Sequence, residues 1–336
     1  MKTAVIGAGS WGTALATVLV DAGHEVALWA REPEIEEKIN RDHYNPTYLR
    51  DIRLSNKITA YSSLKDCCCN TQLIIMATPS HAMREMAQQL AECIDPETVV
   101  VSVAKGIELD GFNTMSEVLS DVLHNVVHPE QIGVLSGPSH AEEVALRKPT
   151  AVVCSSKSRE TAAFIQRNVM TTSLRIYINM DITGVEIAGS VKNIMAIATG
   201  IIAGADYGDN AAAGLITRSL AEIKRLGIKM GANDETFNGL AGIGDLVVTC
   251  TSRHSRNRYV GYQIGKGQTL DQIIEGMDMV AEGVKTTRSV YEWAQSLNIE
   301  MPITESVYQV LFENVKPQEA AHGLMTRQPK EESQSV

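Results

Sequence analysis

Eight short runs rich in Val and Ile occupy the first half of the chain, and most are separated by patterns typical of helices. The runs are KTAVIG (2–7), EVALWA (25–30), KITA (57–60), LIIMAT (73–78), TVVVSVA (98–104), IGVLSG (132–137), TAVVCS (150–155) and LRIYIN (174–179). Strands that alternate with helices and are apolar throughout are buried on both faces of a parallel sheet. The first half therefore predicts a doubly wound, mainly parallel α/β fold.

The second half has a different pattern. From about residue 181 to about residue 320 the segments are helical, and none reads as a convincing strand. A chain of 336 residues is long enough for two domains. We expect an α/β domain over residues 1–180 and an all-α domain over 181–325. The polar segment 326–336 is expected to be a disordered tail.

Composition limits the partners of the chain. The net charge of −10 disfavours a nucleic acid, whose phosphates would be repelled. The longest apolar run, near 187–205, is interrupted by Lys192 and Asn193, so no stable membrane insertion is expected. The first residues read as a strand and not as a secretory signal. Six cysteines without metal-ligand spacing indicate reduced thiols and no metal site. Together these features favour the cytoplasm, and the apolar helical half favours a homodimer.

The first strand is followed by the pattern GxGxxG at Gly7, Gly9 and Gly12, which opens a helix. The first glycine allows the tight turn, the second lets a pyrophosphate approach the backbone, and the third lets helix and strand pack closely. The free N–H groups of the helix start suit phosphates. We therefore expect a dinucleotide here, with Ser10 and Trp11 among its contacts.

The end of the second strand bears on the choice of dinucleotide. A site selective for NAD has Asp or Glu there, to bind the ribose 2′-hydroxyl. This chain instead has Arg31 followed by Glu32, and an arginine can bind a 2′-phosphate. NADPH is therefore the favoured cofactor, with NADH possible.

Seven motifs carry a resemblance to a known family: GAGSWGTALA, VSVAKGIE, SGPSHAEEVA, GSVKNIMAIATGI, GLAGIGDLVVTC, SRNRYVG and VAEGVKT. In this order they are similar to those of bacterial-type NAD(P)-dependent glycerol-3-phosphate dehydrogenase, from residue 7 to about 320. The resemblance implies a Rossmann domain followed by a helical domain. It also implies reversible reduction of dihydroxyacetone phosphate to sn-glycerol 3-phosphate, which supplies glycerophospholipid synthesis. One departure is Arg50 after Tyr48-Leu49, where the family often has proline, and it bears on cofactor preference.

Lys192 lies in a segment that is apolar nearly all round, which predicts a buried helix. Burial lowers the pKa of a lysine, as a general acid working near neutral pH requires. The resemblance makes Lys192 the proton donor and acceptor, with Asn193 helping to hold the substrate. An alternative reading is a structural pair between Lys192 and Asp245, and both could hold if Asp245 orients the ammonium.

The resemblance assigns further contacts. Lys105 follows the fifth strand at its carboxyl end, where open α/β sheets bind ligands, and would touch both cofactor and substrate. Arginines cluster near residues 253–258, and a guanidinium matches phosphate oxygens in pairs. The implied substrate contacts are Lys105, Gly137, Ser139, Lys192, Asp245, Ser255, Arg256 and Asn257. The implied cofactor contacts beyond the glycine turn are Arg31, Lys105, Ala141, Arg256, Val280 and Glu282.

Two other functions stay open on the residues alone. A dehydrogenase of similar architecture acting on a hydroxy acid would also place Lys and Asn on the first long helix of its second domain. A non-catalytic NADP(H)-binding sensor would need neither a buried lysine nor an anion clamp. The arginine cluster favours a phosphate substrate over a carboxylate.

Overall fold

The computed structural model describes residues 1–277, 281–329 and 331–332, and it divides the chain into two compact units. Unit 1 comprises Met1–Ala104 and Met115–Ile182, and unit 2 comprises Lys105–Thr114 and Thr183–Val336. The short segment Lys105–Thr114 therefore lies between two parts of unit 1 in the sequence but belongs to unit 2. Of the expected tail at 326–336, residues 330 and 333–336 lie outside the described residues.

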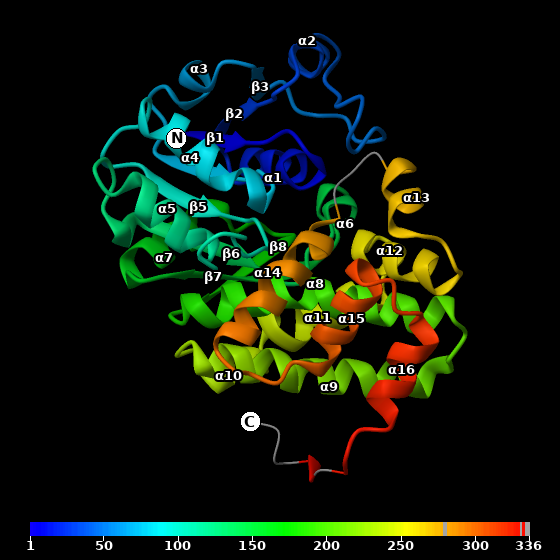
Figure 1. The fold of residues 1–336 in the computed structure, drawn as a ribbon. Coiled ribbons are helices and arrows are strands. Elements are labelled where there is room, and N and C mark those ends of the chain that lie inside the picture. The colour runs from blue at the N-terminus through cyan, green and yellow to red at the C-terminus, as the bar shows by residue number, and fades with distance from the viewer. Residues whose placement is uncertain (278–280, 330, 333–336) are drawn as a thin grey trace. The chain divides into compact units, whose positions relative to one another are not determined.

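Unit 1 is built on one eight-stranded sheet with the strand order β3-β2-β1-β4-β5-β6-β7-β8 (Figure 1). All neighbouring strands are parallel except β6 and β7, which are antiparallel. The strands are β1 (Lys2–Ile6), β2 (Glu25–Trp29), β3 (Ile58–Tyr61), β4 (Leu73–Met76), β5 (Val99–Ser102), β6 (Ile132–Ser136), β7 (Thr150–Ser156) and β8 (Leu174–Asn179). Each coincides with one of the eight runs predicted from the sequence, so the predicted mainly parallel fold is confirmed.

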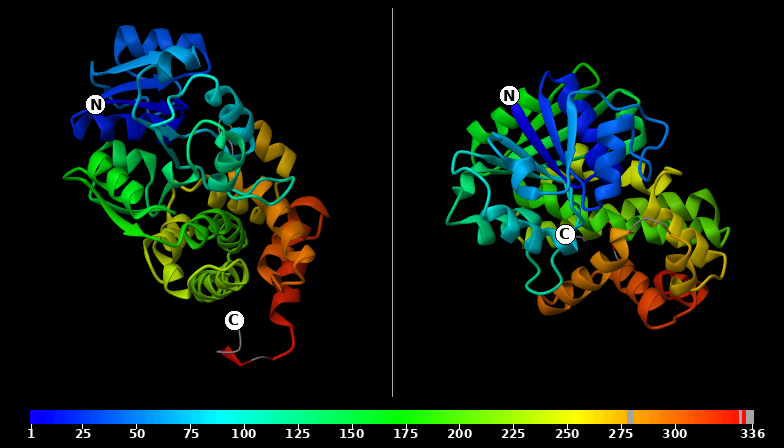
Figure 2. Two further views of the ribbon diagram at one scale, coloured as in Figure 1. Left: turned by 90° about the vertical axis from the view of Figure 1, so that its left-hand side faces the viewer. Right: turned by 90° about the horizontal axis from the view of Figure 1, so that it is seen from above.

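Helices cover both faces of this sheet, as the right-hand view of Figure 2 shows. They are α1 (Ser10–Asp21), α2 (Pro33–Asp42), α3 (Leu64–Cys68), α4 (Met83–Ala91), α5 (Met115–Leu123), α6 (Ala141–Ala145) and α7 (Arg159–Val169), with short turns η1 (Ser80–Ala82) and η2 (Pro129–Gln131). Val5 belongs to the apolar cluster that includes side chains of α1, α2, α6 and α7, whereas its neighbours Ala4 and Ile6 belong to the cluster with α3, α4 and α5. Successive residues of a strand point to opposite faces of the sheet. Because helices cover both faces, the residues on both faces must be apolar.

The regular elements in the described part of unit 2 are all helices, apart from an isolated bridge between Ile107 and Thr114. Its elements are α8 (Ile182–Gly204), α9 (Gly208–Lys229), α10 (Asp234–Phe237), the π-helical turn η3 (Leu240–Gly244), α11 (Asp245–Thr251), α12 (Arg256–Gly265), α13 (Leu270–Glu275), α14 (Glu282–Ser296), α15 (Pro302–Phe312) and α16 (Pro317–Met325). Its core gathers side chains from α8 to α15 together with Ile107 of the inserted segment. The predicted all-α second half is therefore confirmed.

Helix α8 explains the most apolar stretch of the sequence. It has the length and mean hydropathy of a membrane span, but 89% of its apolar window is buried inside the protein. A helix surrounded by protein on all sides is apolar all round for the same reason as a membrane helix. Burial, and not a bilayer, accounts for its composition.

The start of α15 depends on a side chain from another helix. Its N-cap residue Met301 provides no side-chain hydrogen bond. Instead, the buried carboxylate of Glu222 on α9 accepts hydrogen bonds from the N–H groups of Ile303 (2.9 Å) and Thr304 (2.8 Å). The first N–H groups of a helix have no partner within the helix, so Glu222 supplies what a local cap usually would.

We expect Glu222→Ala to lower the free energy of unfolding by about 2–5 kcal/mol. Two buried N–H groups would lose their acceptor, and each costs about 1–3 kcal/mol. Urea denaturation followed by circular dichroism measures the loss. The matched control is Glu313→Ala, which removes an exposed carboxylate beyond the other end of α15 and should change stability by less than about 0.5 kcal/mol. Equal stabilities for the two variants would contradict the capping role.

Candidate functional site

The glycine turn in unit 1 joins β1 to α1. Gly7 has φ +118°, a backbone conformation that residues with a side chain rarely adopt. Its N–H donates to the carbonyl oxygen of Trp29 in β2. A Cβ on Gly12 would overlap the carbonyl oxygen of Gly7, so only glycine allows this approach. Gly9 has open space where its Cβ would point. This is the opening that a pyrophosphate needs to approach the backbone, so the turn fits a dinucleotide.

The start of α1 fits the same ligand. Gly9 is its N-cap and offers no side chain, and the first helical hydrogen bond runs from Thr13 N to Gly9 O. The N–H groups of Trp11 and Gly12 precede that bond and have no acceptor within the helix, which suits phosphate oxygens. The buried Asn45 donates to Ala8 O (2.8 Å) and Thr13 Oγ1 (3.0 Å). This support came from a loop that the sequence analysis had not singled out.

Arg31 follows β2, and its side chain is 81% exposed. It forms an ion pair with Glu32 through two hydrogen bonds. Nε and Nη2 of Arg31 donate to Oε1 of Glu32 over 2.9 and 2.6 Å. These hydrogen bonds raise the pKa of the guanidinium above its usual value. Arg31 is therefore charged and accessible, but its neighbour competes with any phosphate for it.

Gly137, Ser139 and Ala141 follow β6 in unit 1. The parallel strands β1, β4, β5 and β6 end at one edge of the sheet, so this segment and the glycine turn share that edge. Gly137 has φ +132°, and Ser139 Oγ donates to Gly137 O at 2.9 Å. Ala141 begins α6, which packs beside α1. The carboxyl edge of such a sheet is where ligands bind.

Three charged side chains of unit 2 form a cluster around one buried carboxylate. Lys192 of α8 and Asp245, the first residue of α11, form an ion pair through Nζ and Oδ1, with side chains only 5% and 1% exposed. Lys105 Nζ donates to the other carboxylate oxygen, Oδ2, at 2.7 Å. One carboxylate therefore holds two ammonium groups, one on each oxygen. The sequence analysis suggested the pair of Lys192 with Asp245, but it did not join Lys105 to that carboxylate.

This environment changes the protonation of both partners. Burial, helped by the positive charge of Lys105, lowers the pKa of Lys192 to about 7, although Asp245 opposes the shift. Burial works to raise the pKa of Asp245, but Lys105 and Lys192 outweigh it and lower that pKa below its usual value. At neutral pH Asp245 is therefore ionised, and Lys192 can both give and take a proton.

Two polar side chains complete the cluster. Lys192 Nζ donates to Thr249 Oγ1 at 2.7 Å, and that hydroxyl donates to Asp245 O. Asn193 Nδ2 donates to the carbonyl oxygen of Lys105 at 3.1 Å. The sequence analysis missed Thr249, although its spacing of four residues from Asp245 puts both on one face of α11.

The segment Lys105–Thr114 carries Lys105 into unit 2 and is anchored there. Ile107 is part of the core of unit 2, and its carbonyl oxygen accepts from Ser289 Oγ. The ring of Phe112 stacks on Trp293 of α14 with centroids 6.2 Å apart. These contacts hold the start of the segment in place, so Lys105 does not depend on its ion pair alone.

Ser255, Arg256 and Asn257 lie at the start of α12. Ser255 Oγ caps the helix by accepting from Arg258 N (3.2 Å), and Arg256 is the exposed first residue. Asn257 is buried, and its Oδ1 accepts from Gly283 N (2.9 Å) near the start of α14. A helix start with an arginine beside it suits an anion. Glu282 is the first residue of α14, whereas Val280 lies outside the described residues.

Glycines fix α12 against α8. Added Cβ atoms on Gly200 and Gly204 of α8 would overlap the backbone of α12 at Arg258 and Tyr262, and those on Gly261 and Gly265 of α12 would press on the backbone of α8. The sequence signal is a pair of glycines four residues apart in each segment, which the sequence analysis did not use. This close contact between the backbones of α8 and α12 sets the distance between the helix that carries Lys192 and the helix that carries Arg256.

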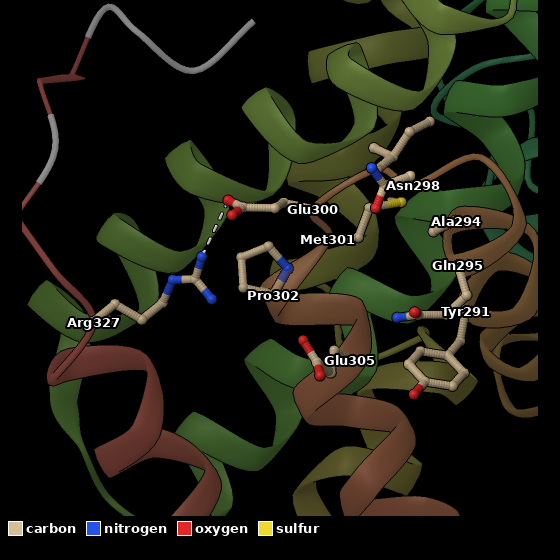
Figure 3. Close-up of a pocket in the computed structure, with 10 residues that line it drawn as sticks. Tyr291, Ala294, Gln295, Asn298, Glu300, Met301, Pro302, Glu305 and Arg327 are labelled. Carbon is tan, nitrogen blue, oxygen red and sulfur yellow. Dashed lines mark hydrogen bonds and ion pairs between the residues drawn. The ribbon is translucent and has the colours of Figure 1, made fainter.

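A separate cavity of about 250 Å³ lies between α14, α15 and Arg327. Figure 3 shows Glu300 and Glu305 on its wall, and Arg327 pairs with Glu300 at 3.2 Å. It includes no member of the Lys192 cluster. Among the described residues no group of three His, Cys, Asp or Glu side chains could hold a metal ion.

Comparison with known proteins agrees with this geometry. Residues 2–162 match the N-terminal and residues 181–322 the C-terminal part of NAD-dependent glycerol-3-phosphate dehydrogenase. Two relatives named glycerol-3-phosphate dehydrogenase [NAD(P)+] are 52% identical (Chlorobium phaeobacteroides, 99% of each chain covered) and 53% identical (Salinibacter ruber, 99% of this chain and 97% of the relative). The crystal structure of glycerol-3-phosphate dehydrogenase from Coxiella burnetii has a TM-score of 0.93 at 39% identity, covering 97% of this chain and 99% of that one. This chain therefore belongs to the NAD-dependent glycerol-3-phosphate dehydrogenase family.

Proposed function

We propose that this chain reduces dihydroxyacetone phosphate to sn-glycerol 3-phosphate, reversibly, with Lys192 as the proton donor. The observation that carries the proposal is a buried ammonium of lowered pKa, held by Asp245 and Thr249, in a chain of this family. The direct test is to mix the protein with NADPH and dihydroxyacetone phosphate and follow absorbance at the nicotinamide band. A 2-keto acid in place of the phosphate substrate tests the alternative of a hydroxy-acid dehydrogenase.

The proton step uses Lys192. When bound, the nicotinamide supplies a hydride to the carbonyl carbon, and the carbonyl oxygen then needs a proton. An ammonium has three hydrogens, and Lys192 directs two of them to Asp245 and Thr249, which leaves the third for the substrate oxygen. A pKa of about 7 matches the donor to neutral pH, where general acid catalysis is most effective. Asp245 orients the ammonium and stabilises its charged form.

The substrate phosphate is assigned to the start of α12. Arg256 supplies a guanidinium, Asn257 an amide and Ser255 the cap of the helix. Their shared location is what supports the assignment, since a helix start favours an anion. Lys105, Gly137 and Ser139 complete the proposed substrate contacts.

The glycine turn is proposed to hold the dinucleotide, with contacts from Gly7 to Gly12, Arg31 and Ala141. Lys105, Arg256 and Glu282 are proposed as further contacts with it. An arginine in place of the acidic residue of NAD-selective sites supports a preference for NADPH, and Glu32 keeps NADH usable. The product supplies glycerophospholipid synthesis. We also infer that the protein is a homodimer in the cytoplasm, and the six free thiols, which fit a reducing compartment, support the location.

Replacement of Lys192 tests the proton donor. We expect Lys192→Ala to reduce kcat about 10²–10⁴-fold, the usual effect of losing a positioned acid, while the Kd for NADPH stays within a few-fold. Lys192→Arg should not restore activity, because a guanidinium does not give up its proton near neutral pH. Steady-state kinetics and fluorescence titration of NADPH measure both. A variant that keeps more than about a tenth of the original kcat would move the acid role to another group.

The pH profile tests the lowered pKa. Reduction needs protonated Lys192, so kcat/KM for reduction should be full below pH 7 and fall as the pH rises through about 7. Oxidation needs the neutral amine and should show the opposite trend. Asp245→Asn removes the carboxylate that raises the pKa of Lys192, so the falling limb should move to lower pH. An unchanged limb in this variant would contradict the assignment of that limb to Lys192.

Arg31→Asp tests the cofactor preference. An aspartate would repel the 2′-phosphate of NADPH and accept a hydrogen bond from the 2′-hydroxyl of NADH. We expect the ratio of kcat/KM for NADPH over NADH to fall at least tenfold, on the order of one lost charged contact. Arg41→Asp, an exposed change on α2, is the control for a general charge effect. The interpretation fails if the unchanged protein already prefers NADH.

A further inference from the structure

Gly283 occupies an unusual position beside two asparagines of the site. It is the buried second residue of α14, and its N–H donates to Asn257 Oδ1 over 2.9 Å. Asn257 belongs to the first turn of α12, beside Arg256. A backbone group from α14 is thus in direct contact with the side chain to which the phosphate is assigned.

The hydrogen bond fixes which end of the amide is available. A backbone N–H can only donate, so the atom of Asn257 that faces Gly283 must be the oxygen. The Nδ2 group then points away from Gly283, and it has no partner among the described residues. The polar group of Asn257 that has no partner among the described residues is therefore a donor. A phosphate dianion has only acceptors, so this orientation favours it.

Space at Gly283 is equally restricted. A Cβ there would lie 2.8 Å from Asn257 Oδ1 and 2.8 Å from the carbonyl oxygen of Asn193, which follows Lys192 on α8. The φ angle of Gly283 is not positive, so the requirement for glycine comes from close approach and not from backbone conformation. Any side chain would push α14 away from both helices and break the N–H contact with Asn257.

We propose that Gly283 is a positioning residue for phosphate recognition: its N–H locks the Asn257 amide with the Nδ2 donors toward the anion. The inference rests on the proposed function, since it deepens the assignment of Asn257 to the substrate phosphate. It predicts an effect on the recognition of the phosphate group and not on the proton step. The two effects can be measured separately.

The experiment compares two substrates that differ only in the phosphate. For Gly283→Ala we expect the ratio of kcat/KM for dihydroxyacetone phosphate over dihydroxyacetone to fall about 10–100-fold, as for a lost hydrogen bond to a charged group. The activity with dihydroxyacetone should change much less. Gly323→Ala is the matched control, because this exposed glycine of α16 has open space at its Cβ. It should leave both values unchanged. An unchanged ratio in Gly283→Ala would overturn the proposal.

A double variant tests whether Gly283 acts through Asn257. Asn257→Ala should itself lower the ratio, and adding Gly283→Ala should lower it little further, because the side chain to be oriented is gone. Losses that multiply in the double variant would show that Gly283 acts independently, and the proposal would be wrong.

Asn257→Asp keeps the test decisive even if Gly283→Ala does not fold. The aspartate has the same shape and still accepts from Gly283 N, but it offers no donor to the phosphate. We expect it to lower the ratio at least as much as Asn257→Ala, and a retained ratio would overturn the proposal. An unchanged protein that does not oxidise NADPH with dihydroxyacetone phosphate would instead refute the proposed function. The two failures are therefore distinguishable.

Discussion

The arrangement of unit 2 depends on one buried carboxylate. Asp245 is almost fully buried and holds the ammonium groups of Lys192 and Lys105 on its two oxygens. A buried charge without a partner is costly, so α8, α11 and the segment Lys105–Thr114 must be placed together for any of the three charges to be tolerated. Two cations on one anion also leave the cluster with a positive charge. That excess suits an anionic ligand, while burial, with a smaller contribution from Lys105, lowers the pKa of Lys192.

The insertion of Lys105–Thr114 connects the sheet with this cluster through the chain itself. Strand β5 of unit 1 ends at Ser102, and Lys105, three residues later, is the first residue of the segment that belongs to unit 2. Ile107, Phe112 and the hydrogen bond from Ser289 anchor the segment independently of the charges. Lys105 therefore reaches Asp245 from a backbone that is fixed by apolar packing. Because the backbone is already held, forming the ion pair restricts only the rotamers of the Lys105 side chain.

The sequence was most informative where the pattern is local. The eight strands follow from runs of apolar residues, the glycine turn from its spacing, and Lys192 from being the one charged residue in the apolar stretch 187–205. Contacts between residues distant in sequence could not be predicted in the same way. Nothing local indicates that Lys105 shares Asp245, that Asn45 supports the glycine turn, or that Glu222 caps a helix some eighty residues later. Each depends on packing that places two separate segments side by side.

Glycines set the spacing of the charged groups in unit 2. Gly200, Gly204, Gly261 and Gly265 bring α8 and α12 to backbone contact, and Gly283 brings α14 against both. Such contacts leave no side chains to adjust, so the main chain fixes the distance between the backbones of α8 and α12, while Asp245 and Thr249 hold the ammonium of Lys192. A site that protonates one end of a small substrate while holding the other needs this fixed span, since small displacements of the reacting groups cost large factors in rate. In the proposed mechanism the glycines therefore contribute through the geometry they impose, even though they provide no reactive group.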